Sequence, residues 1–397
     1  MADPGALVTP RLLGLVTMAS ASLARVALGA LLAVVAARSL PPFEAQVLFQ
    51  SLFLQSGAIA FLSASAFARG AALAHRQVAV SASWRSFLRF CSVWSVASTL
   101  IIGIALCIIV GTNNRDATLL GLLMGSGAAA SALNAFIQGI ATVSEGRIRA
   151  FAPGLGITSL TLLALGVALQ GSSLIALVGI WCLSQIVMPV ALLTAAPATR
   201  ALLGGPGNEG HRGGDYFAAT GVVNAGSVAA VFGYREQWAR AHDARSAADG
   251  FYVSRLSELV LQVIYMAAAS TPRILEGANR LARNRPGRTT LLVVGLLAGA
   301  FSLGANLVEP STTKFRLGVA EITAMPIRVL ASICLLMLLS RFTARAYLQA
   351  VVLSTLALAF TWFTPLGSGP LALSSVQALM CVTIVSWTAV ASSGESK

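Results

Sequence analysis

The sequence predicts an all-α membrane protein that crosses the bilayer many times. Hydrophobic residues make up 56% of the chain and charged residues only 10%, and the mean hydropathy is +0.80. Soluble domains carry about 25% charged residues. The apolar residues come in runs of roughly 18–25, the length that a helix needs to cross about 30 Å of hydrocarbon. Short polar breaks separate these runs, so the predicted loops are too small for chemistry outside the membrane.

Twelve apolar runs are predicted to be transmembrane helices, at residues 12–37, 45–68, 87–110, 117–142, 153–170, 174–196, 216–234, 250–271, 289–308, 316–340, 345–364 and 371–391. The first run is too long for the apolar region of a signal peptide and lacks a clear A-x-A cleavage site, so we interpret it as the first span. The 5 cysteines lie in or beside the spans without a C-x-x-C pair, which is typical of apolar core residues. We expect no metal and no other cofactor.

Lysine and arginine are distributed unevenly between the predicted loops. With the N-terminus in the cytoplasm, the cytoplasmic segments carry 17 of the 27 basic residues and the opposite side carries 7. This asymmetry follows the positive-inside rule. Because the number of spans is even, both termini are predicted to be cytoplasmic. Most of the net charge of +13 is therefore explained by orientation in the membrane.

A break rich in glycine and proline divides the chain into two halves. It contains Leu203-Gly204-Gly205-Pro206-Gly207 and Arg212-Gly213-Gly214, a composition that indicates a linker rather than a helix. We therefore predict an N-terminal six-helix bundle at 1–196, a cytoplasmic linker at 197–215 and a C-terminal six-helix bundle at 216–397. The two halves would share one orientation, like the parallel repeats of many transporters.

Three arginines, Arg25, Arg255 and Arg328, lie well inside predicted spans. An arginine at the bilayer centre costs about 2.5–3.5 kcal/mol, so these side chains are expected to face a protein-lined or water-filled interior. A cationic interior suits an anionic cargo. The alternative is neutralisation by an acid: Arg255 with Glu258, and Arg328 or Glu321 with a neighbouring helix. Arg25 has no acid in its own span, which favours contact with cargo.

Uncharged polar residues recur at helical spacing within several spans. The amides either contact cargo or form hydrogen bonds between helices. The residues concerned are Gln46 and Gln50 in the second span, Ser131, Asn134, Gln138 and Thr142 in the fourth, Asn224 in the seventh and Gln262 in the eighth. Arg235 closes the seventh span, and Pro326 is a predicted kink between Glu321 and Arg328.

The motifs of several function classes are missing from the sequence. There is no G-x-x-x-x-G-K-[ST] phosphate loop of an ATPase. There is no G-x-S-x-G elbow and no pair of intramembrane carboxylates for hydrolysis. No span has the regularly repeated arginines of a voltage sensor. These observations favour a transporter over an enzyme.

Two segments resemble Wzx-type polysaccharide flippases. Residues Leu31–Gln50, LLAVVAARSLPPFEAQVLFQ, are similar to the junction of that family's first two spans, where an apolar helix ends in an Ala-Arg-x-Leu-Gly-Pro-like turn. Residues Tyr234–Glu276 are similar to the seventh and eighth spans. The corresponding residues there are Arg235-Glu236, Gly250-Phe251-Tyr252, Arg255 and Thr271-Pro272-Arg273.

This resemblance implies a member of the multidrug/oligosaccharidyl-lipid/polysaccharide (MOP) exporter superfamily. Its members have two six-helix bundles around a central cavity lined by the first, second, seventh and eighth spans, and they work by alternating access. Wzx-type members flip a polyprenyl-pyrophosphate-linked oligosaccharide repeat unit, of O-antigen or exopolysaccharide, from the inner to the outer leaflet of the bacterial inner membrane. The residues expected at the cavity are Arg25 and Arg255 at the pyrophosphate and Gln46, Gln50, Asn224 and Gln262 along the sugar path. Those expected in coupling or gating are Glu258, Glu321, Arg328 and Arg235.

The expected partners are the anionic lipid-linked oligosaccharide and membrane lipids, and no nucleic acid. Polysaccharide polymerase, glycosyltransferases and a coupling H⁺ or Na⁺ are further candidates. Four alternatives stay open. A lipid II flippase usually has two further spans, and a multidrug/cation antiporter needs an intramembrane acid such as Glu258 or Glu321. A non-transporting scaffold would anchor glycan-assembly enzymes, and a polymerase or ligase would use the loop Tyr234–Gly250.

Overall fold

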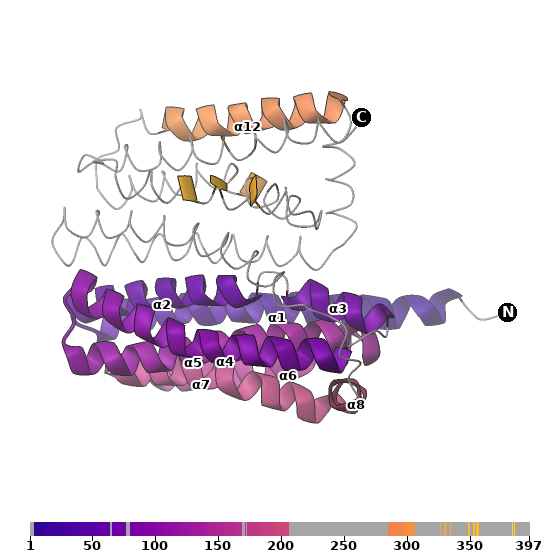
Figure 1. The fold of residues 1–397 in the computed structure, drawn as a ribbon, viewed down its shortest axis with the longest axis horizontal. Helices are drawn as coiled ribbons and strands as arrows, with labels where there is room; N and C mark the ends of the chain where they lie inside the picture. The colour runs from indigo at the N-terminus through magenta and orange to yellow at the C-terminus, as the bar shows by residue number, and fades with distance from the viewer. Residues whose placement is uncertain are drawn as a thin grey trace. The chain divides into compact units, whose positions relative to one another are not determined.

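The described part of the chain is helical throughout. A computed structural model describes residues 4–63, 66–76, 80–168, 171, 173–205 and 285–305, together with scattered positions after 325. The chain divides into two compact units, Met1–Ala225 and Gly226–Lys397. We call them unit 1 and unit 2, and each is described by itself. Every secondary-structure element within the described ranges is a helix (Figure 1).

Unit 1 is a bundle in which the long helices run side by side, while the short helix α8 lies across one end (Figure 1). Its elements are α1 (Pro4–Ser39), α2 (Pro42–Ser63), α3 (Ala66–Arg76), α4 (Val80–Ile104) with a π-helical continuation η1 (Ala105–Val110), α5 (Asn114–Ser144), α6 (Arg147–Ala168), α7 (Leu174–Ala195) and α8 (Pro197–Gly204). In unit 2 the described helix is α12 (Arg285–Ala305).

Within the described residues, 5 helices are long and apolar enough to cross a membrane: Val16–Ser39, Val80–Ile108, Asn114–Ser144, Arg147–Ala168 and Leu174–Ala195. They coincide with the first and the third to sixth predicted spans. The predicted second and ninth spans fall largely on α2 with α3 and on α12. The protein is therefore a multi-pass helical membrane protein. The total of twelve spans, the orientation and the domain bounds stay predictions.

Local sequence signals explain where several helices begin and end. Asn113 caps α5, because its side chain accepts a hydrogen bond from the Asp116 amide at 2.8 Å. Ser173 caps α7 in the same way, through the Ala176 amide. Gly111 ends η1 with a φ of 81°, a left-handed conformation that favours glycine.

The predicted linker begins with a helix, so the expectation that this segment is not helical is wrong for Pro197–Gly204. Pro197 occupies the first turn, where its fixed φ suits a helix and its missing N–H costs nothing. Thr199 and Leu203 are buried against the bundle, with exposed fractions of 0% and 8%. The glycine-rich sequence that indicated a linker starts only where α8 ends.

The centre of unit 1 is α5, which packs against α2, α3, α4, α6 and α7. Glycines let neighbouring backbones approach it closely. A Cβ added at Gly125 would lie 2.8 Å from the Thr99 amide nitrogen of α4. A Cβ added at Gly139 would collide with the Phe67 carbonyl of α3. Such contacts are typical of helices that associate in lipid through close packing of small residues.

Aromatic side chains fill the core between α4 and α5. Phe87 and Phe136 are both fully buried, and their ring centroids lie 5.0 Å apart. Trp84 stacks on the same Phe136 ring at 6.0 Å. Because offset aromatic pairs add about 0.5–1.5 kcal/mol beyond the area they bury, this cluster fixes the position of α4 on α5.

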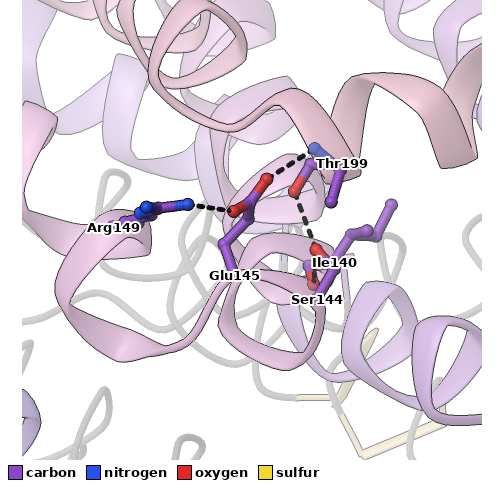
Figure 2. A network of polar contacts seen from close by, with 6 residues as sticks. Ile140, Ser144, Glu145, Arg149 and Thr199 are labelled. Carbon is purple, nitrogen blue, oxygen red and sulfur yellow. Dashed lines mark hydrogen bonds and ion pairs between the residues drawn. The ribbon is translucent and has the colours of Figure 1, made fainter.

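A polar cluster at one end of the bundle holds α8 in place (Figure 2). The Glu145 carboxylate, at the junction of α5 and α6, accepts hydrogen bonds from the Ala198 amide at 2.5 Å and from Arg149 Nη1 at 3.0 Å. The Ser144 and Thr199 hydroxyls lie 2.9 Å apart. Glu145 therefore caps the N-terminus of α8 from another part of the chain, where a negative charge is also favoured by the helix dipole.

The same contacts lower the pKa of the Glu145 carboxyl. The largest cause is the hydrogen bond from Arg149, and the backbone amides of Ala198 and Thr199 add to it, while burial acts in the opposite direction. Because the pKa in the folded protein lies below that of an unfolded glutamate, the ionised carboxylate stabilises the docked α8 above the unfolded pKa, about 4.3. This stabilisation is lost as the pH falls through the lower, folded pKa.

Replacement of Gly139 by alanine is expected to destabilise unit 1. The new methyl group would have to displace backbone atoms of Phe67 and Ala71, and overpacking of this kind costs about 1–3 kcal/mol. Thermal unfolding of the purified full chain in detergent measures the effect. The matched control is Gly166→Ala on α6, where nothing lies within 4 Å of the new Cβ. Equal melting temperatures for the two variants would contradict the packing described for α3 and α5.

Replacement of Glu145 by glutamine is expected to loosen α8 at neutral pH, because glutamine keeps the shape but loses the charge that caps the helix. Hydrogen exchange of the peptide covering 197–204, corrected for intrinsic rates, measures this. In the native chain, protection of α8 should fall as the pH drops below the ordinary glutamate range. In Glu145→Gln that pH dependence should disappear, and an unchanged pH profile would refute the role given to Glu145.

Candidate functional site

Arg25 projects into the interior of unit 1 from α1. Its Nη2 lies 3.2 Å from the Met188 sulfur of α7. The helix α6 approaches the guanidinium at Gly154, where an added Cβ would lie 3.6 Å from the same nitrogen. The residue is nine positions after the start of the apolar segment Val16–Ser39, or about 14 Å along the helix. The cation is therefore held at membrane depth between three helices.

The positive charge of Arg25 is not matched by an acid in the described part of unit 1. The described acids there are Glu44, Asp116 and Glu145, which lie at or next to helix ends. Among the described residues, Arg25 forms no salt bridge with any of them. A thioether is a weak acceptor, and a guanidinium has five N–H donors. Most of its hydrogen-bonding capacity is thus available to an anion.

A cluster of amides lies one turn away along α7, and we call it the interior amide cluster. Its members are Gln55 on α2, Gly127 on α5 and Trp181, Cys182 and Gln185 on α7. Gln55 Nε2 donates to Gln185 Oε1 at 2.9 Å and to the Met124 carbonyl at 3.2 Å. The Trp181 indole donates to Gln55 Oε1 at 2.7 Å.

Gly127 makes room for the interior amide cluster. A Cβ at this position would lie 2.6 Å from Gln185 Oε1 and 2.7 Å from Gln55 Nε2. With its amide turned over, Gln185 donates to the Gly127 carbonyl at 3.1 Å and accepts from Trp181 at 2.9 Å. The Gln55–Gln185 hydrogen bond belongs to the first orientation of the Gln185 amide, and the bonds to Gly127 and Trp181 belong to the second. Gln185 thus has a partner in either orientation, and Gln55 is only 1% exposed.

Asn134 and Gln138 of the polar face predicted on α5 are buried, while Ser131 and Thr142 are partly buried. Gln138 connects two helices. Gln138 Nε2 donates to the Ala150 carbonyl of α6 at 3.1 Å. Asn134 is 4% exposed, and its Oδ1 has no hydrogen-bond partner among the residues that the structure describes. Asn134 is seven positions after Gly127, two helical turns, so both lie on the same side of α5.

Three of the ten residues predicted from the sequence to form the site lie in the described part. Arg25 faces α6 and α7. On α2, Gln50 is fully buried and Gln46 is partly buried. The other seven lie outside the described residues: Asn224, Arg235, Arg255, Glu258, Gln262, Glu321 and Arg328.

The sequence prediction missed Gln55, Trp181 and Gln185. Gln55 follows Gln50 by five positions, so it lies on a different side of α2 from the predicted amide face. A signal for the other two was present, because Trp181 and Gln185 are four residues apart and share one face of α7. Met188 continues that face by three positions, which places Arg25 next to the cluster.

Arg25 and the interior amide cluster together can bind an anion, which a neutral bundle interior cannot do. The amide cluster joins α2, α5 and α7 rigidly, and the guanidinium beside it offers several donors to one acceptor group. Arginine gives paired, charge-assisted hydrogen bonds to phosphate and carboxylate oxygens, and these strengthen where water is scarce. The site is therefore suited to binding an anion at membrane depth.

Fold and apolar helices together define the class of a multi-pass helical membrane protein. No family model and no curated protein matches the sequence. Solved structures do share the fold. One is an inward-facing multidrug resistance MATE family transporter of the MOP superfamily, with a TM-score of 0.59, 16% identity and coverage of 92% of this chain and 94% of that one.

A second solved structure with this fold is the lipid II flippase MurJ in an inward closed conformation. It matches with a TM-score of 0.58 and 14% identity, over 96% of this chain and 87% of that one. Both structures are of transport proteins rather than enzymes. The chain thus shares its fold with these two solved structures along nearly its whole length.

Loss of the Gln55–Gln185 contact is expected to weaken the packing of α2 on α7. Interhelical hydrogen bonds in membrane proteins contribute about 0.6 kcal/mol on average and up to about 1.7. A double-mutant cycle of Gln55→Ala and Gln185→Ala, followed by unfolding titration in mixed micelles, measures the coupling free energy. The control is Ser92→Ala, whose hydroxyl donates only within α4, to Leu88. Strict additivity of the two glutamine substitutions would show that the contact contributes nothing.

Proposed function

We propose that this protein is a flippase of the MOP fold that moves an anionic, lipid-linked oligosaccharide across the bilayer by alternating access. The cargo is a polyprenyl-pyrophosphate-linked repeat unit of O-antigen or exopolysaccharide. The membrane is the bacterial inner membrane, and the direction is from its inner to its outer leaflet. The observation that carries this proposal is Arg25, a cation at membrane depth with no acid beside it in the described part of the chain.

The chemistry of the cargo matches what Arg25 offers. A pyrophosphate carries more than one negative charge and cannot cross hydrocarbon without neutralising contacts. A guanidinium supplies paired hydrogen bonds to it, and charge-assisted bonds contribute about 1.5–3 kcal/mol each. The polyprenyl tail would stay in the bilayer while the head group passes through the protein interior. A cation at membrane depth would neutralise the pyrophosphate during this passage.

The remaining residues are assigned to the proposed cargo path by their chemistry. Arg255 is proposed as a second pyrophosphate contact, and the sugar hydroxyls would meet amides. Coupling to H⁺ or Na⁺ and gating are proposed for the charged residues of the second half. The amides are Gln46, Gln50, Asn224 and Gln262, and the coupling or gating residues are Glu258, Glu321, Arg328 and Arg235. Polymerase and glycosyltransferases are the proposed protein partners.

A lipid II flippase is the second candidate function. It is favoured by the structural similarity to a solved lipid II flippase. A multidrug/cation antiporter is less well supported. The described apolar segments of unit 1 contain one arginine at membrane depth, and their one acid, Asp116, lies at a helix end.

Arg25→Gln is expected to reduce flipping of a fluorescent polyprenyl-pyrophosphate oligosaccharide in liposomes by roughly 10- to 100-fold, the loss that follows from about 1.5–3 kcal/mol. Arg25→Lys should keep part of the activity, because lysine keeps the charge but not the paired geometry. The assay measures how fast cargo in the outer leaflet becomes protected from an added quencher or enzyme.

The control variant is Arg38→Gln, which removes an exposed arginine from the last turn of the same helix. Wild-type flipping by Arg25→Gln at equal protein level would overturn the role of Arg25. Three cargoes separate the candidate functions: the oligosaccharide carrier, lipid II and an organic cation. Transport of the cation alone would overturn the flippase proposal.

A further inference from the structure

The helix α4 has two opposite faces. Val80, Phe87 and Cys91 lie on one face and are at most 5% exposed, because they pack into the core with α5 and α8. The opposite face carries Val93, Val96 and Leu100, which are 59–72% exposed. Large apolar side chains exposed at helical spacing on a transmembrane segment are expected to face lipid.

Two arginines extend this lipid-facing stripe toward the N-terminus of α4. Arg85 and Arg89 are exposed, and they precede Val93 by eight and four positions. Steps of three to four residues keep Arg85, Arg89, Val93, Val96 and Leu100 on one side of the helix. The two arginines therefore lie on the exposed side of α4, away from the interior of unit 1.

The length of the helix puts these arginines at the level of the lipid head groups. The apolar segment Val80–Ile108 has 29 residues. About 20 residues suffice to cross the hydrocarbon. If the segment leaves the hydrocarbon at Ile108, the twentieth residue counted back from that boundary is Arg89. The surplus of about nine residues extends roughly 13 Å further and includes Arg85. Gly111 ends the helix at the other side, so the surplus lies at the Arg85 end.

The described charges at this end of unit 1 are positive except for Glu145. The described acid at this end is Glu145, and it is engaged by Arg149 and the amides of α8. Arg200 is exposed on α8, which packs against α4. A ligand that reaches Arg85 and Arg89 therefore meets a cationic surface beside an apolar stripe.

We propose that Arg85 and Arg89 bind the phosphate of an anionic bilayer phospholipid, whose acyl chains lie along Val93, Val96 and Leu100. Two guanidinium groups one turn apart can share the phosphate oxygens. The apolar stripe next to the two arginines accepts the acyl chains of the lipid. A soluble anion has no acyl chains and would not contact this stripe. This site faces the bilayer and is separate from Arg25 and from the proposed cargo.

Native mass spectrometry of the full-length protein in detergent tests the proposal, with added phosphatidylglycerol or phosphatidylcholine as probes. Near a membrane surface each arginine contributes about 1 kcal/mol to binding, or roughly fivefold, so Arg85→Gln/Arg89→Gln should bind phosphatidylglycerol roughly 25-fold more weakly. The matched control is Arg38→Gln/Arg115→Gln, two exposed arginines at the other end of the helices. It should retain wild-type binding.

The expected result is preference for phosphatidylglycerol in the wild type and the control, and its loss in the Arg85/Arg89 variant. Equal binding of the two lipids by the wild type overturns the proposal, as does undiminished phosphatidylglycerol binding by the variant. If Arg85→Gln/Arg89→Gln does not fold, Arg85→Lys/Arg89→Lys is measured instead. It keeps the charge and loses the paired contacts, so it should bind a few-fold more weakly, and wild-type binding would again refute the site.

Discussion

The close approach of α5 to its neighbours is the contact on which unit 1 depends. Lipid offers helices no hydrophobic gain for associating, so packing of small residues and hydrogen bonds must hold them together. Glycines on α5 admit α3 and α4 to backbone contact, as at Gly125 and Gly139. Further along, Gln138 bonds the Ala150 carbonyl of α6. Where α5 ends, Glu145 caps α8. One central helix thus sets the positions of the elements around it.

The described interior of unit 1 combines a hydrogen-bonded polar cluster with an arginine that has no ion pair among the described residues. Gln55, Trp181 and Gln185 exchange hydrogen bonds among themselves and with backbone carbonyls. Polar groups paired in this way hold helices in register and leave little capacity for a ligand. Arg25, one turn away, contacts a thioether within the described residues. This contrast separates a structural part of the interior from the part that has binding capacity.

Much of the fold of unit 1 could be predicted from the sequence because the bilayer imposes a length on apolar runs. The first and the third to sixth predicted spans correspond to membrane-length helices. Arg25 was singled out for the same physical reason, the cost of a charge in hydrocarbon. The helix α8 was not predicted, since it depends on a carboxylate from Glu145, 53 positions before Ala198. The amide cluster was also missed, because its members come from three helices and only packing brings them together.

The sequence by itself determined that the chain is a helical membrane protein with a cation at membrane depth. Those properties follow from hydropathy and charge, which belong to each residue and do not depend on its neighbours in the fold. Only the tertiary structure decided which side of α2 carries the amide that bonds α7, which helices surround Arg25 and which arginines are exposed. These are relations between helices, set by the rotation of each helix in the bundle. Close contacts at Gly127 and Gly139 determine that rotation, and no single helix specifies them.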